Sequence, residues 1–328
     1  MYISSEYRDV EPKCYDADHI SQVEALIKKN FPGYFKSFLD SGTGGISMEQ
    51  FAELQIHFGV RPERQRKGNR SQRETYIEII TDSVSGFLKD RQKYLDIFDE
   101  EALEEYEDEP GVFKTEILKN QCPIIRKTYA NKRAKELDKY RKDFNLSSAD
   151  KLLTVVQNLY QFGTNYYTDF YQRDSYEDID AYKGLNIEAL DGEDYTAYGV
   201  IGGGIKSHML YKVWPEVFPS RSRAAIWALW YLTEKQTFGF RTDSEFLMID
   251  TRKTITQQNY FYPYSLFGWY AFIIYKLLRD EATRLGAYID PEYRYVIVDR
   301  FFDYIAETHS DEISLFQRQI ANEGRGFD

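Results

Sequence analysis

Three consecutive glycines followed by a lysine form the part of this chain whose residue types and spacing best suit chemistry. The stretch 202–207 reads Gly-Gly-Gly-Ile-Lys-Ser, and the apolar run 209–214 follows it. Glycines allow a tight turn in which backbone N–H groups face an anion at the N-terminus of a helix. The pattern predicts a hairpin turn that leads into a helix beginning near Ile205, with Lys206 at its start.

This stretch resembles the hairpin of the helix-hairpin-helix DNA glycosylases, and the segment 218–227 is similar to the one that follows the hairpin there. The resemblance implies a helical core, a DNA partner, and removal of a base by cleavage of its N-glycosidic bond without a cofactor. It places Lys206 where lyase-type members carry their nucleophile. Those proteins have a catalytic aspartate in the second segment, whereas this chain has Ser220 and Arg221.

Lys206 can act in two ways. A nucleophilic amine must be neutral, and burial or a neighbouring cation favours the neutral form. A protonated Lys206 would instead contact a phosphate as a point charge. The residues expected to contact DNA are Gly202, Gly203, Gly204, Ser207, Arg221 and Arg223.

Two further residue sets are expected at a glycosylase site. Cleavage of a C–N glycosidic bond builds positive charge on the sugar, which a carboxylate stabilises. Because positions 220 and 221 carry no acid, the expected carboxylates are Asp243, Glu245 and Asp250. An extruded base is held between aromatic side chains. The expected base pocket comprises Trp227, Trp230, Tyr260 and Tyr262, with Tyr166, Tyr167 and Trp269 as further aromatic candidates. Each of these rings also suits a hydrophobic core.

Two alternative functions stay open. Residues 298–309 are similar to the last helix of the queuosine-salvage nucleoside hydrolases, which implies cleavage of a small deazapurine-like nucleoside. The absent acid at positions 220 and 221 is what a non-catalytic DNA-binding or protein-binding module would show. Under the glycosylase interpretation, a pocket rich in tyrosine suits a bulky modified base and a role in bacterial defence against phages.

Composition narrows the class of protein. The 328 residues include two cysteines and four histidines, with no CxxC pair, so neither a metal site nor a disulfide framework is expected. No apolar run approaches the ~20 residues of a membrane span, which predicts a cytoplasmic protein. The net charge of −11 disfavours indiscriminate binding of polyanions. Six basic residues against one acid in the stretch 61–73 offer a local basic surface, or a solvated loop.

Apolar spacing and capping residues predict a mainly α protein with two domains. An N-terminal helical domain is expected over residues 1–146, and a glycosylase-like helix-hairpin-helix core over residues 147–328. Within the core, helix signals begin at Ser148, Ser222, Tyr264 and Asp290. Residues 169–193, rich in Asp, Tyr and Gly, are expected to wrap over the surface or over the site.

Overall fold

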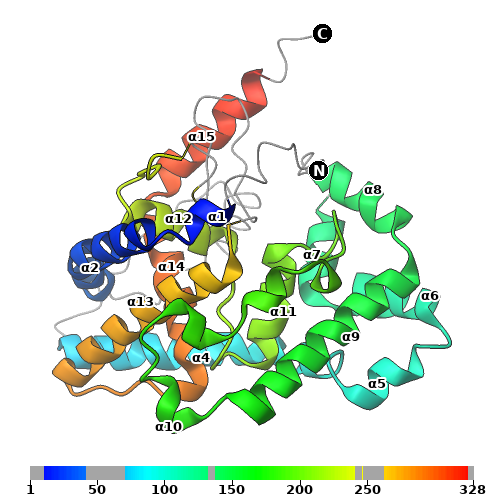
Figure 1. Cartoon of the computed structure of the whole chain (residues 1–328). Helices are drawn as coiled ribbons and strands as arrows, with labels where there is room; N and C mark the ends of the chain where they lie inside the picture. The colour runs from blue at the N-terminus through cyan, green and yellow to red at the C-terminus, as the bar shows by residue number, and fades with distance from the viewer. Residues whose placement is uncertain (1–10, 42–70, 132–136, 241–245, 247–261, 324–328) are drawn as a thin grey trace. The chain divides into compact units, whose positions relative to one another are not determined.

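The computed structural model describes residues 11–41, 71–131, 137–240, 246 and 262–323. These residues are mainly α-helical, which confirms the predicted class (Figure 1). Among them the single strand-like feature is an isolated antiparallel bridge between Ala197 and Ile201. None of the described helices combines the length and the apolar character needed to cross a membrane.

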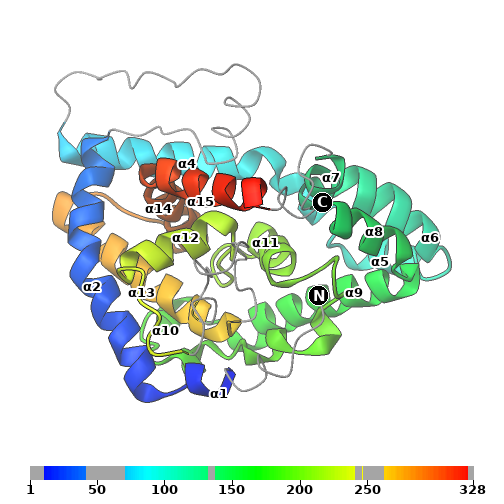
Figure 2. The same ribbon diagram turned by 90° about the horizontal axis from the view of Figure 1, so that it is seen from above.

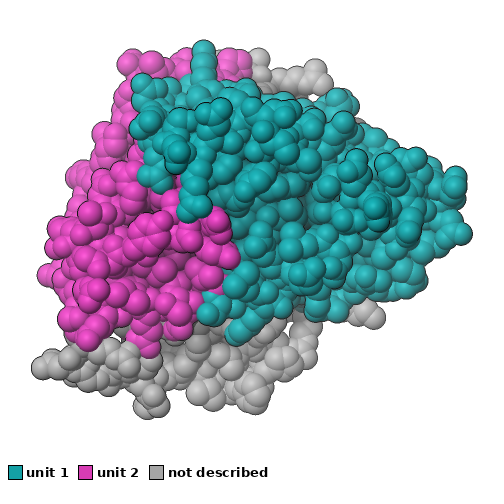
Figure 3. Space-filling view, turned by 90° about the horizontal axis from the view of Figure 1, so that it is seen from below, with its two compact units in different colours: residues 1–3, 85–221, 263–269 teal, residues 4–84, 222–262, 270–328 magenta. Residues whose placement is uncertain are grey.

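The chain divides into two compact units, which Figure 3 distinguishes by colour. The described part of unit 1 comprises residues 85–131, 137–221 and 263–269, and that of unit 2 comprises the described residues of 4–84, 222–262 and 270–328. The expected boundary between residues 146 and 147 does not coincide with this division, because both residues lie within unit 1. Only a short turn separates them from the next helix, whose N-cap is Ser148.

Unit 1 contains the glycine-rich stretch and is built around one long amphipathic helix, α9. Figures 1 and 2 both show α11 beside α9. The helices of this unit are α5 (Glu100–Glu105), α6 (Pro110–Val112), the π-helix η2 (Phe113–Gln121), α7 (Pro123–Ala130), α8 (Asp138–Leu146), α9 (Ala149–Asn165), the π-helix η4 (Tyr166–Phe170), α10 (Arg173–Tyr176), the 3-10 helices η5 (Tyr182–Leu185), η6 (Glu188–Asp191) and η7 (Glu193–Tyr195), and α11 (Gly203–Val213).

Unit 2 is also helical, and its α12 packs against α14 and α2. The helices of this unit are α1 (Glu11–Cys14), α2 (Ala17–Asp40), α12 (Arg223–Leu232), the 3-10 helix η8 (Pro291–Tyr293), α14 (Arg294–Thr308) and α15 (Ser310–Glu323). Two helices contribute residues to both units, namely α4 (Gln72–Leu95) and α13 (Tyr264–Leu285).

The sequence explains why α9 forms and which face it buries. The Ser148 side chain accepts a hydrogen bond from the Lys151 N–H at 3.4 Å and so caps the helix start. The apolar residues recur at helical spacing and are buried: Leu152, Leu153, Val155, Val156 and Leu159. Gly163 completes this face, and a Cβ atom there would overlap the Trp214 ring at the end of α11. The missing side chain therefore allows α11 to approach α9 closely.

Candidate functional site

A tight turn precedes α11, but it is formed by residues 197–201 and not by the three glycines 202–204 from which a hairpin is predicted. Ala197 and Ile201 exchange two backbone hydrogen bonds of 3.1 and 2.8 Å, and Gly199 at the tip has a φ of +80°. Gly202 is the N-cap, and the first helical bond runs from the Lys206 N–H to the Gly202 carbonyl at 3.0 Å. The helix begins at Gly203 rather than near Ile205, because Gly203 and Gly204 adopt helical geometry themselves.

Lys206 points inward and is only 5% exposed. Its Nζ donates hydrogen bonds to the carbonyl of Leu190 and, at 3.1 Å, to the Thr196 hydroxyl. Burial lowers the pKa of Lys206 to about 8, and the nearby Arg221 acts in the same direction, while Asp191 opposes both. A substantial fraction of Lys206 is therefore neutral at mildly alkaline pH.

Lys206, Asp191 and Arg221 form a cluster of charged side chains, in which Asp191 is the acid. Both of its carboxylate oxygens lie within hydrogen-bond distance of the Tyr264 N–H, at 3.0 and 2.9 Å, where the first turn of α13 begins. Burial raises the pKa of Asp191, although Arg221, the Tyr264 N–H and Lys206 each favour the charged form. A carboxyl group whose pKa is raised in this way suits proton transfer.

The loop 219–221 joins the cluster from the other side. The Tyr264 hydroxyl donates to the Pro219 carbonyl at 2.8 Å, and the Arg221 guanidinium lies over the Tyr264 ring, 5.6 Å from its centroid. Ser207 accepts the Arg221 backbone N–H at 3.0 Å. His208 lies 3.2 Å from the Ser220 hydroxyl through its Nδ1. These contacts tie the first turn of α11 to the segment in which the resembled family carries its aspartate.

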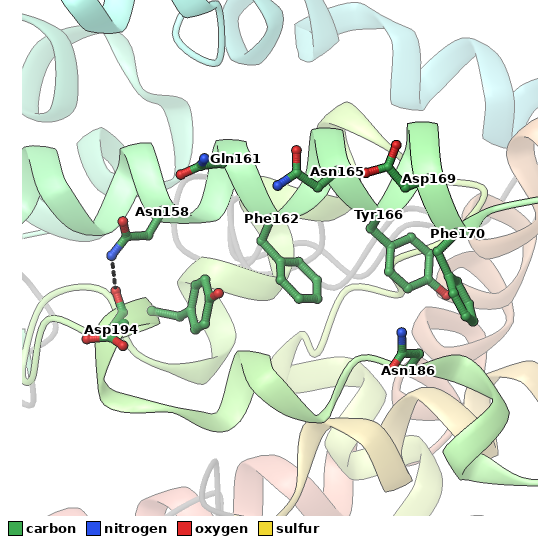
Figure 4. Close-up of a pocket in the computed structure, with 10 residues that line it drawn as sticks. Asn158, Gln161, Phe162, Asn165, Tyr166, Asp169, Phe170, Asn186 and Asp194 are labelled. Atoms are coloured by element: carbon green, nitrogen blue, oxygen red, sulfur yellow. Dashed lines mark hydrogen bonds between the residues drawn. The ribbon is translucent and has the colours of Figure 1, made fainter.

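A cavity of about 800 Å³ opens in the same unit, between α9 with η4 and the 3-10 segments that follow (Figure 4). In Figure 4 the rings of Phe162 and Tyr166 point from the helix toward the opposite wall, which Asn186 and Asp194 help to form. The lining residues are Asn158, Gln161, Phe162, Asn165, Tyr166, Asp169, Phe170, Asn186, Asp194 and Tyr195. Tyr195 directly precedes Thr196, the hydroxyl partner of Lys206, so the cavity wall and the cluster share one stretch of chain.

The other residues that are expected to contact DNA differ in their exposure to solvent. Arg223 is exposed, whereas Arg221 is 1% exposed, and the buried Ser207 is hydrogen-bonded within its own chain. Gly202, Gly203 and Gly204 are partly exposed at the start of α11.

The expected base-pocket rings that the structure describes lie in the core of unit 2. Trp227 is fully buried, Trp230 is 6% exposed, and Tyr262 is 1% exposed. The Tyr262 hydroxyl is 2.7 Å from His19 Nε2 and 2.9 Å from the Tyr270 hydroxyl. Of the further aromatic candidates, Tyr166 lines the cavity in unit 1, Tyr167 is exposed, and Trp269 is buried.

Several expected residues lie outside the described part of the chain. They are the carboxylates Asp243, Glu245 and Asp250, the aromatic Tyr260, and all but three residues of the basic stretch 61–73. Residues 96–109, by contrast, are described; they include nine acidic and no basic side chains, and the carboxylates are exposed.

Sequence reasoning did not single out Asp191 or the amide side chains of the cavity. Asp191 falls in the segment 169–193 that was expected to wrap over the surface or the site, and this composition was the available signal. The amide side chains lie on the polar face of α9, and sequence periodicity gives no sign that another segment faces them.

Comparisons of the chain with known protein families, curated proteins and solved structures returned no match. Among the described residues, no three His, Cys, Asp or Glu side chains are grouped as a metal site would need. The assignment of function therefore rests on the residues and their geometry.

Proposed function

We propose that this protein cleaves the N-glycosidic bond of a nucleobase-bearing substrate. The observation that carries the proposal is the juxtaposition of the buried Lys206, whose pKa is lowered to about 8, and the partly exposed Asp191, whose pKa is raised. Perturbed pKa values of opposite sense in neighbouring groups are typical of acid–base and nucleophilic sites. The cavity of the same unit, whose lining includes Tyr195 next to Thr196, supplies aromatic rings for a base.

In this mechanism the neutral Lys206 amine attacks the sugar C1′. The C1′–N bond breaks and its electron pair leaves with the base. The Asp191 carboxylate accepts a proton from the attached nitrogen and passes it to that base. Opening of the sugar ring, with transfer of the remaining N–H proton to the ring oxygen, then gives a Schiff base. Water then hydrolyses the Schiff base, which releases the sugar and restores Lys206. Asp191 thus takes the place of the acid that positions 220 and 221 lack, and Asp243, Glu245 and Asp250 are the alternative acids.

The experiment is trapping with borohydride, which reduces a Schiff base to a stable covalent adduct. Wild-type protein should form an adduct with a base-bearing DNA oligonucleotide or a nucleoside and release the free base. Lys206→Gln should abolish the adduct, whereas Lys151→Gln, at an exposed lysine of α9, should leave it unchanged. Base release that survives Lys206→Gln would remove the nucleophile role and leave the lysine with its structural hydrogen bonds to Leu190 and Thr196.

DNA and a free nucleoside both contain the N-glycosidic bond that this chemistry would cleave, so either class could be the substrate. The exposed Arg223 and the glycine turn support DNA, while the net charge of −11 supports a nucleoside. The salt dependence of the binding affinity distinguishes the two substrates. Each phosphate contact releases counterions, so DNA affinity falls steeply with added salt. An uncharged nucleoside has no such dependence.

A non-catalytic binding module is the competing function. It is favoured by the hydrogen bonds of Lys206 and Ser207, whose partners within the chain would also hold α11 in place without chemistry. Saturable binding of DNA or nucleoside without release of any base would establish it.

A further inference from the structure

The cavity of unit 1 has two rows of side chains with different chemistry. Positions 158, 161, 165 and 169 carry amides and a carboxylate, and positions 162, 166 and 170 carry aromatic rings. Both rows repeat at the helical spacing of three and four residues, so they run side by side along α9 and η4 (Figure 4). The volume of about 800 Å³ is within the range of roughly 300–1,000 Å³ that small-molecule sites occupy.

The aromatic row is held in a fixed arrangement. The Phe162 ring lies edge to face against Tyr195, with centroids 5.5 Å apart and planes at 72°. It also lies nearly parallel to Tyr166, with a centroid distance of 6.0 Å, and the Tyr166 hydroxyl donates to the Leu185 carbonyl at 2.6 Å. Tyr166 is only 4% exposed and therefore supports the row from behind, so the ring surface open to a planar ligand comes from the partly exposed Phe162 and from Phe170, which is 38% exposed.

The described polar lining carries negative charge and no positive charge. Asp169 and Asp194 are both exposed, and none of the described residues that line the cavity is a Lys, Arg or His. The Asp194 backbone is positioned by the Asn158 side chain, which donates to its carbonyl at 2.9 Å. Gln161 and Asn165 are exposed and bring amide donors and acceptors that can pair with the edge of a heterocycle.

We propose that this cavity binds an uncharged or cationic planar heterocycle bearing amino groups and rejects the phosphorylated form of the same molecule. The carboxylates accept hydrogen bonds from ring amino groups, the amides pair with ring nitrogens and carbonyls, and the rings stack on the ligand face. Asp194 lies beside Asn158 at one end of the lining, and Asp169 lies eleven positions further along the helix at the other end (Figure 4). A phosphate at either end would therefore meet one carboxylate and no counter-cation from the described lining residues. The proposal rests on the proposed function only in choosing nucleosides as probes.

Calorimetric titration of the full chain with adenosine and with adenosine 5′-monophosphate at low ionic strength tests it. Adenosine should bind saturably, and the monophosphate at least about tenfold more weakly, because its doubly charged phosphate meets a carboxylate at whichever end of the cavity it occupies. Asp169→Asn combined with Asp194→Asn should reduce that ratio to about threefold or less. Asp180→Asn, at an exposed acid of the same unit outside the cavity lining, should leave it unchanged.

A ring variant tests the stacking surface. Phe162→Leu keeps apolar volume but removes the ring, and it should weaken adenosine binding about tenfold. The melting temperature checks that this variant is folded. A second variant, Asn165→Ala at the exposed cavity edge, should weaken adenosine binding by about threefold to tenfold.

Equal affinity for both ligands, or no saturable adenosine binding up to about millimolar concentration, would overturn this inference. The outcome is distinguishable from failure of the proposed function. Adenosine binding without base release would support the cavity and contradict the glycosidase. Base release that is unaffected by Phe162→Leu and by the two aspartate changes would support the glycosidase and contradict the cavity as the binding site.

Discussion

Lys206 is subject to opposing influences on its proton. Burial and Arg221 favour the neutral amine, whereas Asp191 favours the ammonium form, and the pKa of Lys206 settles at about 8. A lysine held in this balance has both a reactive neutral fraction and a partner that can exchange protons. The same residue also anchors the 3-10 segments through Leu190 and Thr196, so it joins the first turn of α11 to the chain that forms the cavity wall.

The first prediction concerns the pH dependence of Schiff-base trapping. Only the neutral amine attacks, so the trapping rate should rise about tenfold per pH unit below 8 and level off above it. The initial rate of borohydride trapping from pH 6 to pH 9.5 measures this profile. A rate that does not change across that range would show that Lys206 deprotonation does not control the reaction.

The second prediction concerns Asp191 and Arg221, which shift the pKa of Lys206 in opposite directions. Asp191 raises the pKa of Lys206 and Arg221 lowers it, so Asp191→Asn should move the trapping midpoint below 8, and Arg221→Met should move it above 8. Asp191→Asn should also slow base release by about 100-fold or more if the acid protonates the base. The amide oxygen of asparagine can still accept the Tyr264 N–H, which limits the effect on folding. Midpoints that shift in the same direction in both variants would contradict the assigned electrostatics.

At the scale of elements, the contact between α9 and α11 depends on Gly163. A Cβ atom at this position would meet the Trp214 ring, so Gly163→Ala should lower the free energy of unfolding by about 1–3 kcal/mol. Gly86→Ala is the matched control, because that helical glycine has open space around it, and alanine there should stabilise α4 by about 0.5–1 kcal/mol. Urea denaturation of both variants measures the difference. Equal effects would show that the Trp214 contact does not control the packing.

The link between α11 and the loop 219–221 should be sensitive to acid. Burial lowers the pKa of His208 to about 3, with Lys212 and Lys127 acting in the same direction and Asp90 opposing them. Between pH 6.5 and pH 3 the unfolded chain therefore binds more protons at His208 than the folded chain, and the free energy of unfolding falls as the pH falls. The expected loss from this residue between pH 7 and pH 5 is on the order of 1–2 kcal/mol.

His208→Gln keeps a hydrogen-bonding group for Ser220 and removes the titration. Its unfolding free energy should therefore vary less with pH over this interval than that of the wild type. The same acid dependence in both proteins would assign the effect to other groups.

Local signals sufficed to predict several elements. Ser148 caps α9, Ser222 caps α12, and α13 ends before Gly286, whose φ is +70°. The mainly α class followed from such signals. The cavity did not, because it forms where residues 186–195 face the polar side of α9, and no local pattern specifies that encounter.

The candidate catalytic residues also differ in whether a local sequence pattern reveals them. The glycine pattern identified Lys206 and the start of α11. Asp191 joins Lys206 only through the path of the 3-10 segments, so spacing along the chain did not reveal it. The division into units was likewise not local, since each unit collects segments that are distant in sequence.

At the scale of the whole molecule, charge is the property that we expect to distinguish between the two proposed substrates. The net charge of −11 and the acidic cavity in unit 1 both oppose a polyanion. Any phosphate contact would have to come from local basic groups such as the exposed Arg223.

We therefore expect nucleoside binding to change by less than about twofold between about 50 and 300 mM salt. Binding of duplex DNA, by contrast, should weaken with a slope of about one unit in log–log terms for each phosphate contact. Titrations of both ligands over this range measure the two slopes. A flat slope for DNA that binds saturably would contradict phosphate contacts altogether.

Direct measurement of released base tests the central claim most directly. Wild-type protein, Lys206→Gln, Asp191→Asn and the control Lys151→Gln would be incubated with a panel of nucleosides and base-bearing DNA oligonucleotides, and free bases would be quantified by liquid chromatography. We predict that the wild type and Lys151→Gln release a base from at least one substrate, that Lys206→Gln releases none, and that Asp191→Asn releases it about 100-fold more slowly or worse. Release by Lys206→Gln at the wild-type rate, or no release by the wild type from any substrate, would contradict the account.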